Sequence, residues 1–216
     1  MAYKDVYAAW QADPEAFWMA AAKGIDWVKP PSRALDASRA PIYQWFSDAQ
    51  VNTCWNAVDR HVLAGRGAQA AIIYDSPVTG TVRILTYAEL QDRVARFAGA
   101  LRARGLTRGD RVVIYMPMVP EALEAMLACA RLGVIHSVVF GGFAANELAV
   151  RIDDCQPKAI IAASCGVEPG RIVHYKPLLD GAIELAHHKP EFCVILQREQ
   201  EVADLVPGRD VAWHIF

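Results

Sequence analysis

The sequence predicts an α/β protein in which a parallel-rich sheet with flanking helices follows a helical N-terminal extension. Two short apolar runs, residues 111–115 and 136–140, flank an amphipathic segment that begins at Pro120 and stops at Gly133. A third run, residues 159–163, follows a second helical pattern. Short β-rich runs that alternate with helices of about ten or more residues indicate βαβ units and a parallel sheet.

Residues 1–64 are predicted to form an N-terminal extension that wraps onto the main domain. Asp13 and Pro14 supply an N-cap and a proline for the first helical turn, and Gly24 ends the helix that they open. A second short helix is expected over residues 52–63. Three of the six tryptophans lie within the first 27 residues. Aromatic residues this dense are typical of a segment pinned against a larger body.

Residues 65–216 are predicted to be the first part of the main domain, which opens with two strands and a helix. The β-rich runs at residues 70–74 and 81–85 are joined by a turn-forming link. Thr86 and Glu89 then form a capping-box pattern, and apolar residues at helical core spacing follow them.

The C-terminal part is predicted to continue the sheet. A helix is expected to begin at Pro177, and residues 192–196 have the composition of one more strand. Residues 197–216 carry little pattern, and we expect neither a capping helix nor a closing strand there. Because a parallel sheet begun in this way should continue, we expect the chain to be a piece of a longer protein.

Composition excludes several classes of function. A net charge of −2 and a pI near 6.3 argue against a nucleic-acid or anionic-membrane binder that relies on bulk charge. The five cysteines are dispersed without a CxxC pair, which fits reduced thiols better than disulfides or a zinc site. We find no signal peptide and no apolar stretch long enough for a membrane span, so we expect a soluble cytoplasmic protein.

The glycine-containing segment at residues 166–171 is the first candidate site. Glycine lets backbone N–H groups approach a phosphate closely, and Arg171 offers a forked donor for it. The alternative is an ordinary β-to-α connection whose arginine is a solvated surface charge, and the residues alone favour that alternative.

A second candidate is the turn at residues 140–143. Gly141 and Gly142 would bring the backbone against a flat ligand, on which Phe140 or Phe143 would stack. The alternative is a tight strand-to-helix turn, which the residues again favour.

The remaining reactive side chains indicate no catalytic residue and no metal ligand. His187 and His188 fall at the end of a predicted helix and are expected to be surface residues. Cys129 lies on the apolar helix and is expected in the core, and nothing in the sequence near Cys165 suggests an activated thiolate.

Four stretches closely resemble short-chain acyl-CoA synthetases of the AMP-forming, adenylate-forming superfamily. They are WNAVDRHVLAGRG (residues 55–67), LTYAELQDRVARFAGALRARG (85–105), GDRVVIYMPMVPEALEAMLACARLGVIHSVVFGGFAANELAVRI (109–152) and CGVEPGRIVHYKPLLDGAI (165–183). The resemblance points to propionyl-CoA synthetases (propionate–CoA ligases), with acetyl-CoA synthetases as a sister group. It implies an incomplete N-terminal domain of the AMP-binding fold, covering about the first third of such an enzyme.

The resemblance implies a two-step ligase whose partners are a short-chain carboxylate, ATP with Mg²⁺, and CoA, with no nucleic acid and no membrane. The carboxylate attacks the ATP α-phosphate to give acyl-AMP and pyrophosphate, and the CoA thiol then displaces AMP. The ATP loop, the acyl pocket and the late catalytic lysine of the family are expected beyond Phe216, so this segment alone should form no acyl-AMP. Two alternatives stay open, an acetate–CoA ligase and a non-catalytic CoA-binding or interaction module.

The resemblance also assigns CoA-binding residues. The positions that match the CoA contacts of the acetate enzymes are Glu168, Pro169, Gly170 and Arg171, together with Phe140, Gly141 and Gly142. The acetate relatives carry arginine where Glu168 stands. A carboxylate there repels phosphate, so either the backbone binds or the 3′-phosphate of CoA is held elsewhere.

Overall fold

The computed structural model describes residues 2–216, which fall into two compact units. The first unit runs up to Asn56 and the second is Ala57–Phe216. The predicted domain boundary after residue 64, and the predicted wrapping of the extension onto the main domain, stay predictions. Among the described residues, no helix is long and apolar enough to cross a membrane.

The first unit contains two helices and two short antiparallel strand pairs. The elements are α1 (Tyr3–Ala12), α2 (Pro14–Ala22), β1 (Trp27–Lys29), β2 (Leu35–Asp36), β3 (Gln44–Trp45) and β4 (Gln50–Val51), with β1 pairing β4 and β2 pairing β3. The predicted N-cap is confirmed, since the Asp13 carboxylate accepts a 2.9 Å hydrogen bond from the Ala16 N–H. The sequence did not reveal α1 or the strands, because α1 buries no residue and strands of two or three residues show no periodicity.

The chain continues with helical turns that begin at Trp55, a hairpin and a long helix. These are η1 (Trp55–Asp59), η2 (Val62–Arg66), β5 (Ala70–Ser76), β6 (Thr81–Thr86) and α3 (Tyr87–Ala103). The predicted capping box is confirmed, because Glu89 Oε2 accepts a 2.8 Å hydrogen bond from the Thr86 N–H and the Thr86 side chain accepts one from the Glu89 N–H. Four apolar residues and an alanine of α3 are then buried at helical spacing, as predicted.

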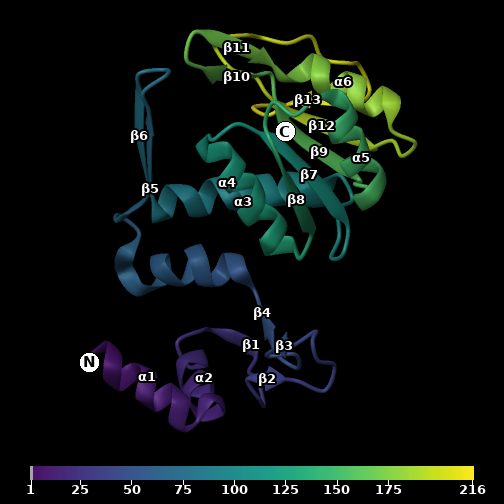
Figure 1. Cartoon of the computed structure of the whole chain (residues 1–216). Helices are drawn as coiled ribbons and strands as arrows, with labels where there is room; N and C mark the ends of the chain where they lie inside the picture. Colours follow the sequence, from purple (N-terminus) through teal and green to yellow (C-terminus); the bar gives the residue numbers. More distant parts are fainter. Residues whose placement is uncertain (1) are drawn as a thin grey trace. The chain divides into compact units, whose positions relative to one another are not determined.

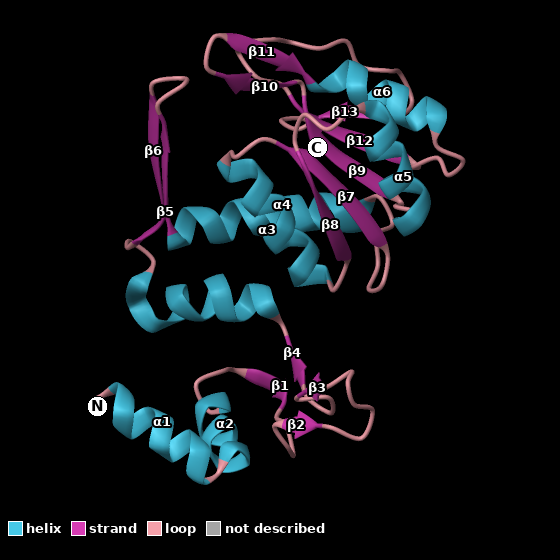
Figure 2. Ribbon diagram, in the orientation of Figure 1, coloured by secondary structure: helices cyan, strands magenta, loops and turns pink. Residues whose placement is uncertain are grey.

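The described part of the second unit is built on a five-stranded parallel sheet in the order β13-β12-β9-β7-β8. The strands are β7 (Arg111–Met116), β8 (Ile135–Phe140), β9 (Ala159–Ala163), β12 (Phe192–Leu196) and β13 (Asp210–Ala212). The helices are α4 (Pro120–Leu132), α5 (Ala145–Cys155) and α6 (Tyr175–Leu185). Helices α5 and α6 cover one face of the sheet, and α4 with α3 covers the other (Figures 1 and 2). The predicted α/β fold with a parallel sheet is confirmed.

One expectation for the C-terminal segment is wrong. Residues 210–212 form the edge strand β13, which pairs in parallel with β12 through Cys193–Asp210 and Ile195–Ala212. A three-residue strand carries no readable local pattern, and its conformation depends on the free edge of β12. Helix α6 also starts at Tyr175, two residues before the predicted Pro177.

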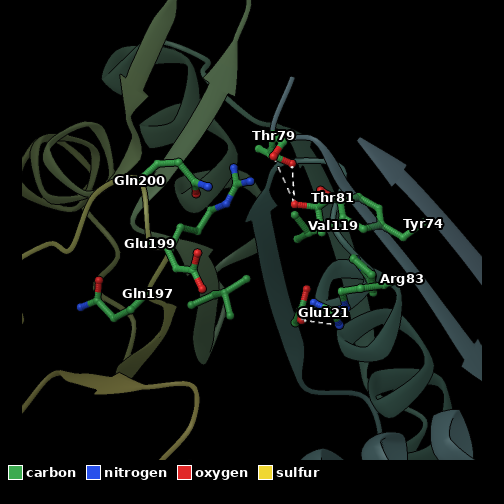
Figure 3. Close-up of a pocket in the computed structure, with 12 residues that line it drawn as sticks. Tyr74, Thr79, Thr81, Arg83, Val119, Glu121, Gln197, Glu199 and Gln200 are labelled. Carbon is green, nitrogen blue, oxygen red and sulfur yellow. Dashed lines mark hydrogen bonds and ion pairs between the residues drawn. The ribbon is translucent and has the colours of Figure 1, made fainter. Parts of the chain in front are cut away.

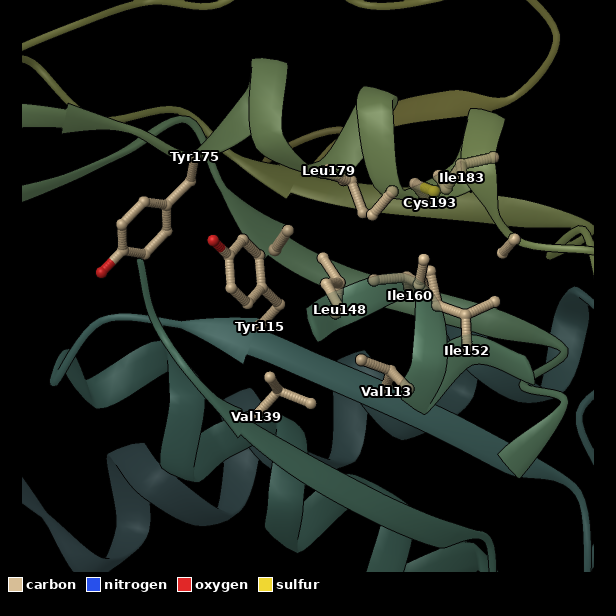
Figure 4. Close-up of a cluster of buried hydrophobic side chains, with 14 of the residues drawn as sticks. Val113, Tyr115, Val139, Leu148, Ile152, Ile160, Tyr175, Leu179, Ile183 and Cys193 are labelled. Carbon is tan, nitrogen blue, oxygen red and sulfur yellow. The ribbon is translucent and has the colours of Figure 1, made fainter. Parts of the chain in front are cut away.

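The core lies between the sheet and helices α5 and α6. Leu148 and Ile152 of α5 and Leu179 of α6 are fully buried against Val113 and Ile160 of the sheet (Figure 4). On the other face, Cys129 of α4 is fully buried, as predicted, and burial raises the pKa of its thiol to about 12. A parallel sheet covered on both faces explains why β7 and β9 are nearly continuous apolar runs.

Candidate functional site

The carboxyl ends of the parallel strands meet at one edge of the sheet, where a cleft of about 380 Å³ lies. Residues that follow β7, β8, β9 and β12 line it, and the β5–β6 hairpin adds one wall. The lining residues are Tyr74–Thr79, Met116–Val119, Val138–Gly141, Val167, Glu168, Tyr175 and Arg198. This is the edge at which open α/β sheets bind ligands.

A second, more polar hollow of about 300 Å³ adjoins this cleft (Figure 3). The two share Tyr74, Thr79, Val119 and Arg198. The hollow also contains the ion pair between Arg83 and Glu121, whose atoms lie 3.1 Å apart. Together the two hollows form a continuous surface with an apolar part and a charged part.

The predicted loop at residues 166–171 is a β-hairpin. Strand β10 (Cys165–Glu168) pairs antiparallel with β11 (Arg171–His174), so the connection from β9 to α6 contains a strand pair in place of a simple loop. Phosphate binding by this segment stays a prediction. Pro169 and Gly170 form its two-residue turn, in which Gly170 has φ +78°. Proline followed by a positive-φ glycine is typical of a type II turn. The Pro-Gly pair was therefore the available sequence signal.

The charged side chains at the hairpin tip are paired with each other. The Arg171 guanidinium lies 2.7 Å from the Glu168 carboxylate, and this hydrogen bond raises the pKa of Arg171. Both side chains are largely exposed. An arginine paired in this way is not the free forked donor that the sequence suggested.

The turn at residues 140–143 is explained by contacts inside the protein. A Cβ atom on Gly141 would lie 2.3 Å from the Tyr175 hydroxyl oxygen, and one on Gly166 would lie 2.6 Å from the same atom. Gly142 has φ +90°, a conformation that favours glycine. The glycines at these positions therefore need no ligand to explain them.

Tyr115 anchors the same turn from the core. Its hydroxyl donates a 2.9 Å hydrogen bond to the Phe143 carbonyl and accepts one of 3.2 Å from the Gly142 N–H. Burial raises the pKa of Tyr115 to about 12, so the hydroxyl stays protonated and keeps donating. The Tyr115 and Tyr175 rings lie 5.1 Å apart between their centroids, which joins this anchor to Tyr175.

The structure brings only some of the predicted CoA-binding residues to the cleft. Phe140, Gly141 and Glu168 line it. Four others are not among its lining residues: Gly142, Pro169, Gly170 and Arg171. The last three form the hairpin tip beside it, and Gly142 follows Gly141 in the turn.

Sequence reasoning missed Tyr175 and Arg198, which line the cleft. Arg198 donates a 3.3 Å hydrogen bond to the Cys165 carbonyl. Its position just after β12, at the carboxyl end of a parallel strand, was a usable signal. Tyr175 gave no such signal, because its partners Gly141 and Gly166 are distant in the sequence.

The structure also shows the surroundings of the other reactive residues. Burial raises the pKa of the Cys165 thiol, so the structure supplies no activated thiolate. His187 is exposed and lies 2.9 Å from the Asp153 carboxylate. Within residues 2–216 no group of three or more His, Cys, Asp or Glu side chains is arranged to hold a metal ion.

The family is decided by comparison with known proteins. A family model described as AMP-binding enzyme matches residues 59–211, which is more than half of the chain. The chain belongs to the AMP-binding enzyme family. A second model, described as the acetyl-coenzyme A synthetase N-terminus, matches residues 3–57.

Curated relatives match nearly the whole chain. An uncharacterized protein of Pseudomonas aeruginosa is 53% identical over 99% of the chain and 34% of its own length. Acyl-CoA synthetase short-chain family member 3, mitochondrial, from Homo sapiens is 49% identical over 98% of the chain and 31% of its own length. Acetyl-coenzyme A synthetase of Streptomyces avermitilis is 43% identical over 97% of the chain and 32% of its own length. The chain thus spans about a third of the length of these relatives.

A solved structure shows the same fold. Acetoacetyl-CoA synthetase from Streptomyces lividans superimposes with a TM-score of 0.84 at 23% identity, over 96% of this chain and 31% of that one. The chain therefore has the fold predicted for an N-terminal region of the adenylate-forming enzymes.

Proposed function

We propose that these residues are the N-terminal part of an AMP-forming short-chain acyl-CoA ligase. A carboxylate oxygen attacks the α-phosphorus of ATP and releases pyrophosphate, and the CoA sulfur then attacks the acyl carbon and releases AMP. The observation that carries the proposal is the match of both family models to consecutive parts of one chain. Relatives named as acyl-CoA and acetyl-CoA synthetases support it.

Propionate is the proposed carboxylate, with acetate as the alternative. The sequence EPGR at residues 168–171 resembles the propionate group, whereas the acetate enzymes carry arginine at the first of these positions. We keep the cytoplasm as the proposed compartment, although one relative is named mitochondrial. ATP and Mg²⁺ are proposed to be bound by parts of the full enzyme outside residues 1–216.

The proposed contribution of this chain is one wall of the CoA site. Phe140 is 74% exposed beside the cleft, so its ring is available to stack on adenine. Arg171 is proposed to leave the Glu168 carboxylate and bind a CoA phosphate instead. The phosphate is the stronger partner because it carries more negative charge than a carboxylate. The exposed backbone of the Pro169–Gly170 turn completes the surface that we assign to CoA.

The test uses the enzyme expressed from the complete reading frame that contains these residues. We expect carboxylate-dependent ATP–pyrophosphate exchange without CoA, thioester formation with CoA, and a higher kcat/KM for propionate than for acetate. The absence of exchange with every short-chain carboxylate would overturn the ligase proposal. A higher kcat/KM for acetate would keep the ligase proposal and identify acetate, not propionate, as the substrate.

The CoA wall is tested with Arg171→Ala in the same enzyme. We expect the KM for CoA to rise about tenfold while ATP–pyrophosphate exchange stays unchanged, since exchange precedes CoA binding. Arg96→Ala is the matched control, because Arg96 is an exposed arginine paired with Asp92 on α3, outside the cleft lining. An unchanged KM in Arg171→Ala would remove Arg171 from the site.

The non-catalytic alternative is tested with the 216-residue chain itself. We expect it to release no pyrophosphate from ATP and propionate. Calorimetric titration with CoA then distinguishes a stand-alone CoA-binding module, which gives heat of binding, from a segment that binds no CoA by itself. No heat at millimolar CoA would exclude the module.

A further inference from the structure

Tyr175 occupies the space between the two segments that we assign to CoA. It is the first residue of α6, its side chain is buried at 5% exposure, and it lines the cleft. Its hydroxyl oxygen would lie 2.3 Å from a Cβ atom on Gly141 of the turn and 2.6 Å from one on Gly166 of the hairpin. The phenol therefore fits only because both neighbours are glycine.

Packing holds the Tyr175 side chain in place. None of the residues 2–216 forms a hydrogen bond with its hydroxyl, and its ring lies against the ring of Tyr115. In Figure 4 the Tyr175 ring stands at the end of the core cluster, and its hydroxyl points away from Leu179 and Ile183. Burial and the nearby Glu168 carboxylate raise the pKa of Tyr175, so the phenol stays neutral.

The backbone of Tyr175 is anchored independently. Its N–H donates a 3.1 Å hydrogen bond to the Ser164 carbonyl at the end of β9. The next residue, Lys176, is buried and forms a 3.0 Å ion pair with the fully buried Asp210 carboxylate of β13. The Tyr175 side chain therefore extends from a backbone position that is held by contacts with the ends of β9 and β13.

We propose that Tyr175 is a positioning residue for CoA, whose ring volume sets the separation between the turn at residues 140–143 and the β10–β11 hairpin. The inference rests on the proposed function, because it takes these two segments as opposite sides of the CoA surface. Phe140 and Gly141 lie on one side, and Val167 and Glu168 lie on the other. A smaller side chain at position 175 leaves a void into which either segment can move.

The first test compares two substitutions in the full enzyme. Tyr175→Leu is expected to raise the KM for CoA about tenfold or more while propionate-dependent ATP–pyrophosphate exchange stays within about twofold of wild type. Tyr175→Phe keeps the ring and is expected to restore the KM to within about twofold of wild type. Tyr87→Phe on α3, where the ring contacts His61, is the matched control.

The second test uses the predicted clash. Gly141→Ala and Gly166→Ala each press a methyl group against the phenol and are expected to raise the KM for CoA. The double variant Gly141→Ala with Tyr175→Leu lacks the phenol, so the alanine methyl group meets no clash. Its KM for CoA is therefore expected to be lower than the sum of the two single-variant effects predicts. Additive effects of the two substitutions on the KM for CoA would overturn the positioning role. The comparison between single and double variants remains usable if Tyr175→Leu lowers the stability of the enzyme.

The outcomes separate the inference from the function on which it rests. A wild-type enzyme without thioester formation refutes the proposed function. An active enzyme in which Tyr175→Leu has an unchanged KM for CoA refutes the positioning role alone. A KM in Tyr175→Phe as high as in Tyr175→Leu also refutes it, because the hydroxyl and not the ring would then be required. A parallel loss of exchange and thioester formation in Tyr175→Leu refutes it as well, since a general structural role predicts that result.

Discussion

Arg171 and Glu168 are paired across the turn of the β10–β11 hairpin, with 2.7 Å between the guanidinium and the carboxylate. The pair leaves the hairpin tip nearly neutral. An arginine in place of Glu168 would make the same tip strongly positive. The net charge of the tip is therefore set by Glu168.

Glu168→Gln is expected to lower the KM for CoA about two- to fivefold, because it frees Arg171 without changing the turn. The gain should be larger for CoA than for dephospho-CoA if the 3′-phosphate meets Arg171. It should shrink with rising salt, since both groups are exposed. Steady-state kinetics at two ionic strengths check this, and a higher KM in Glu168→Gln would contradict it.

Asp210→Asn is expected to destabilise the 216-residue chain by about 1.5–3 kcal/mol at neutral pH, because it removes one of the two carboxylates paired with the buried Lys176, while Asp180 remains as the other. Burial opposes ionisation of Asp210, but hydrogen bonds from Arg209, Val206 and Lys176 outweigh it, and the pKa of Asp210 lies below its ordinary value. Urea denaturation of both chains measures the difference in the free energy of unfolding.

The same lowered pKa predicts a pH dependence. The folded pKa of Asp210 is below the unfolded value of about 3.9, so its stabilisation is present above that pH and is lost as the pH falls through the folded pKa. The difference in unfolding free energy between wild type and Asp210→Asn should therefore narrow in acid. A difference that is constant from neutral to acid pH would argue against an ionised Asp210.

Thr86→Ala is expected to cost about 1 kcal/mol of unfolding free energy, because it removes the side-chain cap from the Glu89 N–H at the start of α3. Glu89→Gln keeps a hydrogen-bonding side chain at the third helical position and should cost less. Thermal denaturation followed by circular dichroism ranks the two variants. A larger loss in Glu89→Gln than in Thr86→Ala would show that the carboxylate charge, not the hydroxyl, carries the cap.

Thiol labelling of the folded chain is expected to modify Cys155 first. Cys155 is half-buried, whereas the other four cysteines are buried, and burial raises the pKa of Cys193 to about 12. The Cys155 thiol also has a raised pKa, through burial, so its reaction should be slow. Mass spectrometry after limited alkylation identifies the site, and all five cysteines should label in denaturant. Fast labelling of Cys165 in the folded chain would contradict the buried hairpin base.

Most strands and helices of the sheet domain were predictable because they have a strong local signal. The apolar runs of β7 and β9, the capping box at Thr86 and the positive-φ Gly133 that ends α4 all act within a few residues. The hairpin at residues 165–174 was misread although its Pro-Gly turn was visible. The edge strand β13 had no local signal of its own.

The sequence by itself determined the fold class, the order of the main strands and helices of the sheet domain, and the family, because hydrophobic periodicity, caps and sequence motifs are local properties. Only the tertiary structure decided that Tyr175 separates the turn from the hairpin, that Glu168 neutralises Arg171 and that Lys176 meets Asp210. Gly141 and Gly166 lie against the Tyr175 phenol because β8, β9 and α6 pack together. Contacts between distant segments leave no pattern in a single sequence, and these contacts set the geometry of the cleft.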